Sequence, residues 1–184
     1  MAKINDVQIK NLHEFRGYEG ESLYQGDIWY KGKKLGLWSE DAHGGICDNL
    51  DFDINLLSDA LNDFKEGKPT EDKGLRDIET FLYILLELTL LEKEANRYFE
   101  RNKNFVVTRL LGLFTPPYYC SADIFQEDED IIEAVNKNLK DTHAKPVVFH
   151  NNDDFNITVD NNHPLPDSLN VFWELKPETT QNLS

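Results

Sequence analysis

Apolar residues recur at helical spacing in one long stretch of this chain, residues 75–101. Leu75, Ile78 and Leu82 begin a series of three- and four-residue steps, which is the period of an α-helix. Further apolar residues widen this stripe to almost the whole circumference, and that distribution is typical of a buried helix. At about 1.5 Å per residue the stretch would span roughly 40 Å. We therefore expect a central core helix against which the rest of the chain packs.

Strand patterns dominate the chain before this helix. Apolar and polar residues alternate, as in half-buried strands, and Lys31-Gly32-Lys33 predicts a tight hairpin turn. The predicted strands cover residues 7–12, 24–30, 35–38 and 46–52. A shorter helix follows them over residues 54–66, with Asp53 as its N-cap.

Strand patterns return after the long helix. The predicted strands cover residues 105–114, 118–125, 146–150 and 155–159, and residues 171–173 form either a last edge strand or a docking segment. One further helix is predicted over residues 127–141, between the second and third of these strands. The order of strands, two helices, strands, helix and strands favours an α+β fold with an N-terminal antiparallel sheet.

Two domain divisions are compatible with this pattern. The chain could form a β-rich module over residues 1–67 and a helix-plus-sheet module over residues 75–176, or one continuous domain around the long helix. Residues 177–184 are predicted to be a flexible tail.

The chain of 184 residues carries a net charge of -15, and the charge is unevenly distributed. Residues 1–46 are nearly neutral, whereas residues 105–184 hold thirteen acids against five bases. Such a chain repels nucleic acids and anionic membranes and attracts basic surfaces. The acidity serves either solubility alone or a partner whose own surface is basic.

The cysteines and the N-terminus indicate the cytoplasm. Cys47 and Cys120 are too few for a disulfide framework or a zinc set, so both are expected to be reduced thiols. The apolar surroundings of Cys120 predict a structural thiol with a raised pKa rather than a nucleophile. The N-terminal residues are polar and lack the apolar region of a signal peptide. Glu79, Glu87 and Glu92 interrupt the long helix, so it is not predicted to span a membrane.

The densest acidic run is Glu127, Asp128, Glu129 and Asp130. Acids in the first turn of a helix stabilise its positive end by roughly 0.3–1 kcal/mol each. Four neighbouring carboxylates also repel one another, so helix capping does not require all of them. The run either caps the helix or offers a phosphate-like strip to a basic groove.

Three clusters combine imidazole with carboxylate. Asp41 and His43 lie in a glycine-containing loop, His143 follows Asp141, and His150 precedes Asp153 and Asp154. Such groups can hold Mg²⁺, Mn²⁺ or Zn²⁺ or perform acid–base chemistry. Asn and Asp runs are also ordinary turn residues, and the spacing matches no metal signature. We therefore assign no metal site and, since no phosphate-binding loop motif is present, no cofactor.

A basic and aromatic cluster surrounds the predicted hairpin. Its members are Tyr24, Trp29, Tyr30 and Trp38 with Lys31, Lys33 and Lys34. Aromatic and basic side chains together can bind single-stranded nucleic acid by stacking. The overall acidity of the chain makes solvated lysines the favoured interpretation.

The N-terminal block IKNLHEFRGYEGESLYQGDIWYKGKKLGLWSEDAHGG resembles the opening of small uncharacterised proteins from phages and integrative elements of Gram-positive bacteria. In size and charge the chain also resembles anti-CRISPR proteins that block Cas9. The resemblance implies an acidic surface presented to the basic channel that holds guide RNA and DNA. It transfers no functional residue to a position in this sequence.

Three functions follow from these patterns. The leading hypothesis is a non-enzymatic inhibitor of a nucleic-acid-binding defence enzyme such as Cas9 or its guide RNA complex, acting in the bacterial cytoplasm. It would bind through Glu127 to Asp130 first and through Asp153 and Asp154 second. The second is a metal-dependent nuclease, or a promoter of guide RNA cleavage, using Asp41, His43, His143, His150 and Asp153. The third is a structural phage protein.

Overall fold

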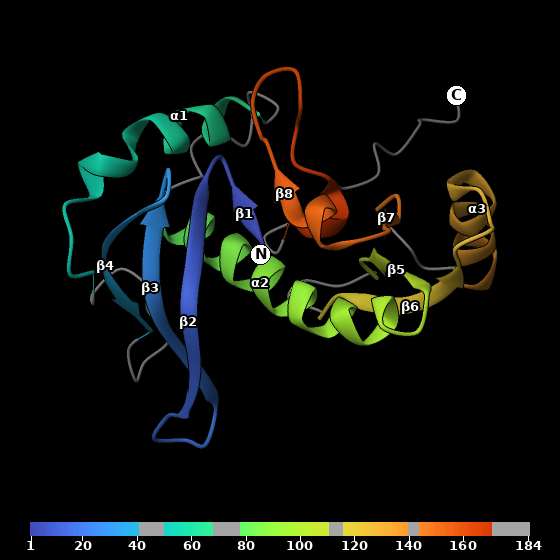
Figure 1. The fold of residues 1–184 in the computed structure, drawn as a ribbon, viewed down its shortest axis with the longest axis horizontal. Coiled ribbons are helices and arrows are strands. Elements are labelled where there is room, and N and C mark those ends of the chain that lie inside the picture. The colour runs from blue at the N-terminus through green and yellow to red at the C-terminus, as the bar shows by residue number, and fades with distance from the viewer. Residues whose placement is uncertain (41–49, 68–77, 111–115, 140–143, 171–184) are drawn as a thin grey trace, which may run out of the picture.

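A computed structural model describes residues 1–40, 50–67, 78–110, 116–139 and 144–170. The α-helices are α1 (Ser58–Glu66), α2 (Ile78–Phe99) and α3 (Asp128–Asn138), and the short 3-10 helices are η2 (Ile54–Leu57), η4 (Asn152–Phe155) and η5 (Asp167–Leu169). The strands are β1 (Lys3–Ile4), β2 (Val7–Arg16), β3 (Ser22–Tyr30), β4 (Lys33–Ser39), β5 (Lys103–Thr108), β6 (Tyr118–Asp123), β7 (Val147–Phe149) and β8 (Asn156–Ile157). The predicted α+β class is confirmed (Figure 1).

The larger sheet has the strand order β4-β3-β2-β1-β8. Its two tight hairpins turn at Asn5-Asp6 and at Lys31-Gly32, where φ is 49° and 63° in the first turn and 47° and 78° in the second. Positive φ at both central residues matches the twist of a hairpin, and the turn predicted at Lys31-Gly32 is confirmed. The sequence did not indicate that β8 would pair in parallel with β1, which brings the later part of the chain beside the first strand.

The smaller sheet has the order β6-β5-β7, with both outer strands antiparallel to β5. The strand predicted over residues 105–114 ends earlier, since β5 stops at Thr108. The helix predicted over residues 127–141 is α3, which ends at Asn138.

Helix α2 connects the two sheets. It contacts β1 and β2 in the larger sheet and β5 in the smaller one, and it runs along the long direction of the molecule (Figure 1). Its buried residues lie on most sides of the helix, as its pattern predicted. Phe81 meets Phe64 of α1 edge to face, with 4.9 Å between the ring centres. One apolar core therefore contains residues of α1, α2 and both sheets.

The smaller sheet lies between two helices. Phe105 and Val107 of β5 belong to the main core with α2. Val106, whose side chain points to the opposite face, packs instead with Ile131 and Val135 of α3. This alternation places α3 on the outer side of the smaller sheet, away from the centre of the molecule.

Two predicted local features lie beside the larger sheet. The side chain of Asp53 accepts a hydrogen bond from the backbone N–H of Asn55, so its predicted capping role is confirmed at η2. Of the strand predicted over residues 46–52, only residues 50–52 lie in the described ranges. Leu50 forms an isolated bridge with Trp38, but residues 51 and 52 are not in a strand, so the prediction is wrong there. None of the helices in the described ranges has the length and apolar content needed to cross a membrane.

Candidate functional site

The acidic run lies at the beginning of α3. Glu127 is the N-cap residue, with extended backbone, and its side chain makes no capping hydrogen bond. Asp128, Glu129 and Asp130 occupy the first turn, where the helix dipole favours negative charge. The predicted position of the run at a helix N-terminus is confirmed, and its charges favour that end of the helix, although the side chain of Glu127 does not cap it.

Three of these four carboxylates face solvent. Glu127, Glu129 and Asp130 are exposed, and within the described ranges their side chains form no hydrogen bond or ion pair. Asp128 differs because its Oδ1 lies 3.0 Å from Nε2 of His150. The fold therefore uses one carboxylate of the run internally and leaves three available to a partner.

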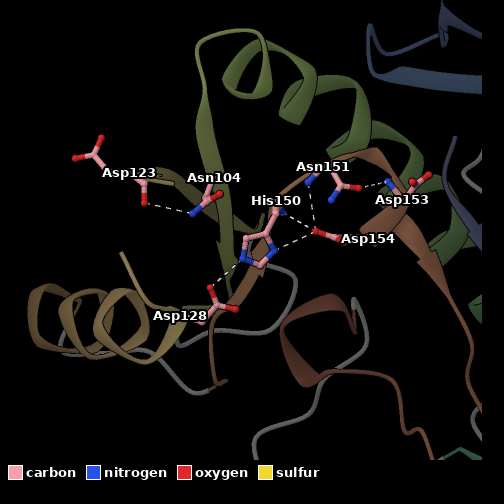
Figure 2. A network of polar contacts seen from close by, with 7 residues as sticks. All are labelled: Asn104, Asp123, Asp128, His150, Asn151, Asp153 and Asp154. Carbon is pink, nitrogen blue, oxygen red and sulfur yellow. Dashed lines mark hydrogen bonds and ion pairs between the residues drawn. The ribbon is translucent and has the colours of Figure 1, made fainter. Parts of the chain in front are cut away.

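His150 joins the acidic run to a second acidic segment. It follows β7, and its ring nitrogens face carboxylates on both sides, Asp128 at 3.0 Å and Asp154 at 3.2 Å (Figure 2). These two acidic clusters are separate in the sequence. The structure brings them together because α3 packs beside β7.

The second acidic segment is a capped 3-10 turn. Asn151 is the N-cap of η4, and its Oδ1 accepts a hydrogen bond of 2.8 Å from the N–H of Asp153. Asp154 completes a capping box, and its Oδ2 accepts from the N–H of His150 at 2.6 Å. Asp154 is thus held within the turn, whereas Asp153 is exposed.

Two opposing influences set the pKa of His150. Its partial burial is the largest single influence and would lower the pKa. The hydrogen bonds and negative charges of Asp128 and Asp154 together outweigh burial, so the pKa is raised above the ordinary value of 6.5. The imidazolium form strengthens the link between α3 and the turn of η4.

Of the five residues in the nuclease hypothesis, the structure describes only His150 and Asp153. Asp41, His43 and His143 lie outside the described residues. His150 contacts Asp128 and Asp154 rather than Asp153. Across the part of the chain that the structure describes, no three His, Cys, Asp or Glu side chains are grouped so that they could hold a metal ion.

Two other predicted features have structural explanations. Burial raises the pKa of the Cys120 thiol, in the predicted direction. In the basic and aromatic cluster, Trp38 is fully buried, so it cannot stack on a base. Lys34 is paired with Asp27 at 2.7 Å, and Lys31 lies over the ring of Tyr30.

Sequence reasoning missed the apolar residues that precede the acidic run. Phe125 is 91% exposed and Ile124 is 47% exposed, although both follow directly on β6. The strand predicted over residues 118–125 therefore extends too far, since β6 ends at Asp123. The signal for a turn was the pair of polar residues around them, Asp123 and Gln126, whose mutual hydrogen bonds close the backbone.

Comparison with known proteins found no matching family model, no matching curated protein and no matching solved structure.

Proposed function

We propose that this protein binds a basic surface of a nucleic-acid-binding protein and blocks it, with Cas9 as the leading target. The observation that carries the proposal is the start of α3, where Glu127, Glu129 and Asp130 are exposed and have no partner among the described residues. Carboxylates presented in this way can replace phosphates against lysine and arginine, in charge-assisted pairs.

The overall charge of the chain also supports binding to a basic surface. The net charge of -15 attracts a basic channel from a distance and disfavours direct binding of nucleic acid. The charge-dependent part of such binding weakens as salt screens it. Inhibition would take place in the cytoplasm of the bacterial host, where Cas9 acts.

The test is a Cas9 cleavage assay in which the protein is titrated and the guide RNA is run on the same gel. We expect inhibition with an intact guide, and weaker inhibition as the salt concentration rises. If the guide RNA is shortened only when Mg²⁺ or Mn²⁺ is present, the nuclease hypothesis would replace the binding hypothesis. Full cleavage by several Cas9 orthologues at saturating protein would reject the Cas9 target.

A matched pair of double variants tests the surface itself. Glu129→Gln with Asp130→Asn removes two exposed charges from α3 and leaves the contact between Asp128 and His150 intact. Asp59→Asn with Asp63→Asn removes two exposed charges from α1 instead. We expect the α3 variant to lose about tenfold in inhibitory potency, corresponding to about 1.4 kcal/mol, and the α1 variant to lose much less. Equal losses would show that only total charge matters.

A further inference from the structure

A closed turn displays two apolar side chains between β6 and α3. The N–H of Gln126 donates to the carbonyl oxygen of Asp123 at 3.1 Å, and Oε1 of Gln126 accepts from the N–H of Asp123 at 3.2 Å. The turn fixes the backbone of Ile124 and Phe125 while their side chains remain exposed. Because the backbone of this turn is already fixed, binding through it would cost little further backbone entropy.

Strand β6, which leads into this turn, is the edge of the smaller sheet. It pairs with β5 on one side, and in the described ranges no strand pairs with its other side. Tyr118 and Tyr119 on this strand are 40% and 41% exposed. An open edge strand offers unpaired backbone N–H and C=O groups to another extended chain.

A pocket lies beside the same edge. It has a volume of about 270 Å³ and lies between β6 and α3, lined among others by Tyr118, Cys120, Ala122, Ile131 and Val135. Alternate side chains of a strand added to β6 would point toward the α3 side of the sheet, where this pocket lies. Apolar contacts are thus available on the edge, in the pocket and at the turn.

We propose that β6 and the turn at Asp123–Gln126 dock an extended segment of a partner protein as an additional strand. The segment would carry apolar side chains for Phe125 and the pocket, and lysine or arginine for Glu127, Glu129 and Asp130. The basic character of the partner rests on the proposed function, and the docking mode deepens it. Main-chain pairing would supply affinity and alternate side chains specificity.

Charge selects this occupant over two others. A second copy of the chain would bring the same acidic turn and another net charge of -15 to the edge, so like charges oppose pairing between copies. A nucleic acid would meet carboxylates at the start of α3. A basic and apolar polypeptide is attracted by both features of the surface.

The experiment uses the full chain and a synthetic peptide, acetyl-Lys-Val-Lys-Phe-Lys-Val-Lys-amide, with binding followed by isothermal calorimetry and by amide NMR shifts. We expect the largest shifts in β6 and the turn. Phe125→Ser should weaken binding about tenfold, or about 1.4 kcal/mol. Tyr18→Ser is the matched control, because Tyr18 is 97% exposed in the loop between β2 and β3. Circular dichroism verifies that both variants fold.

A second peptide, N-methylated at alternate residues on its pairing side, keeps the charge and the side chains but cannot form a ladder. We expect it to bind at least about tenfold more weakly. Equal binding of both peptides, or equal loss in Phe125→Ser and Tyr18→Ser, would overturn the docking mode. Sedimentation experiments compare the oligomeric state of the two proteins. If the wild-type protein dimerises and the Phe125→Ser variant is monomeric, the surface binds a second copy of this chain rather than a partner segment.

The two proposals can fail separately. Peptide binding with the expected dependence, together with uninhibited Cas9, supports the docking surface and rejects the Cas9 target. Inhibition of Cas9 that Phe125→Ser leaves unchanged supports the inhibitor function and overturns this docking surface.

Discussion

Acidic side chains in and beside the larger sheet make contacts within the chain, whereas three of the four at the start of α3 face solvent. Asp27 of β3 accepts from Asn11 at 2.8 Å and pairs with Lys34 at 2.7 Å. Glu40 accepts a hydrogen bond of 2.7 Å from the backbone N–H of Tyr24. Glu129 and Asp130 have no such partner among the described residues. The larger sheet therefore uses these charges to hold the fold, and the start of α3 presents three of its four charges outward.

The same contrast holds for aromatic residues. Phe105 is fully buried between the rings of Tyr98 and Phe149, at 5.1 Å and 6.4 Å between ring centres. Phe125 is the most exposed phenylalanine of the described chain. Burial of an aromatic ring stabilises a fold, so a ring left exposed on a closed turn contributes little to stability and is available for binding. Substitutions in each region test this division, and the largest effect is expected in the core.

Phe105→Ala should lower the free energy of unfolding by about 3–5 kcal/mol, because it removes a buried ring and leaves a cavity. Phe125→Ala should change it by less than about 0.5 kcal/mol, since the ring is exposed. Urea unfolding followed by circular dichroism measures both. A similar loss in the two variants would mean that the turn at Phe125 packs against the core in solution.

Gly36→Ala should destabilise the larger sheet by about 1–3 kcal/mol, as overpacked sites do. A Cβ at this position in β4 would lie 2.3 Å from the carbonyl oxygen of Asp51, so the backbone would have to move. Ser121→Thr adds one methyl group to exposed β6 and is the matched control. We expect the unfolding midpoint of Ser121→Thr in urea to stay within experimental error of wild type. Equal losses of stability in Gly36→Ala and Ser121→Thr would contradict the difference in packing between the two sheets.

Asp27→Asn should reduce stability at neutral pH and flatten its decline in acid. The hydrogen bond from Lys34, then that from Asn11, lowers the pKa of Asp27 below its ordinary value of 3.8. Its contribution is therefore present above that value and is lost as the pH falls through the folded pKa. Thermal unfolding between neutral and acidic pH measures the change. The exposed control Glu129→Gln should change stability in acid less than Asp27→Asn does, and equal changes in both would remove the distinction between engaged and exposed acids.

Asp128→Asn should lower the pKa of His150, because it removes one of the two carboxylates that raise it. The raised pKa means that this contact stabilises the fold fully below pH 6.5 and less as the pH rises through the folded pKa. The effect on unfolding should be below about 1 kcal/mol, since the pair is half exposed. NMR titration of the imidazole measures the pKa of His150 in both proteins. Because Glu129 does not contact His150, Glu129→Gln should leave the pKa of His150 unchanged.

Local pattern determined most of the elements of this chain. The period of residues 75–101 identified α2 and its burial, because a helix that is apolar on most sides is stable only inside a protein. Alternation identified β2 and β3, and the Lys31-Gly32 turn followed from the backbone freedom of glycine. The acidic run was correctly placed at the N-terminus of α3, since carboxylates favour that end of a helix.

Tertiary structure decided which of these elements meet. The parallel pairing of β8 with β1 and the contact of His150 with Asp128 join residues far apart in the sequence, and neither leaves a signal in local periodicity. Exposure was decided in the same way. Phe105 and Phe125 are the same type of residue, so their type does not predict which one is buried. Packing against α2 buries Phe105, and the closed turn at Asp123 leaves Phe125 exposed to solvent.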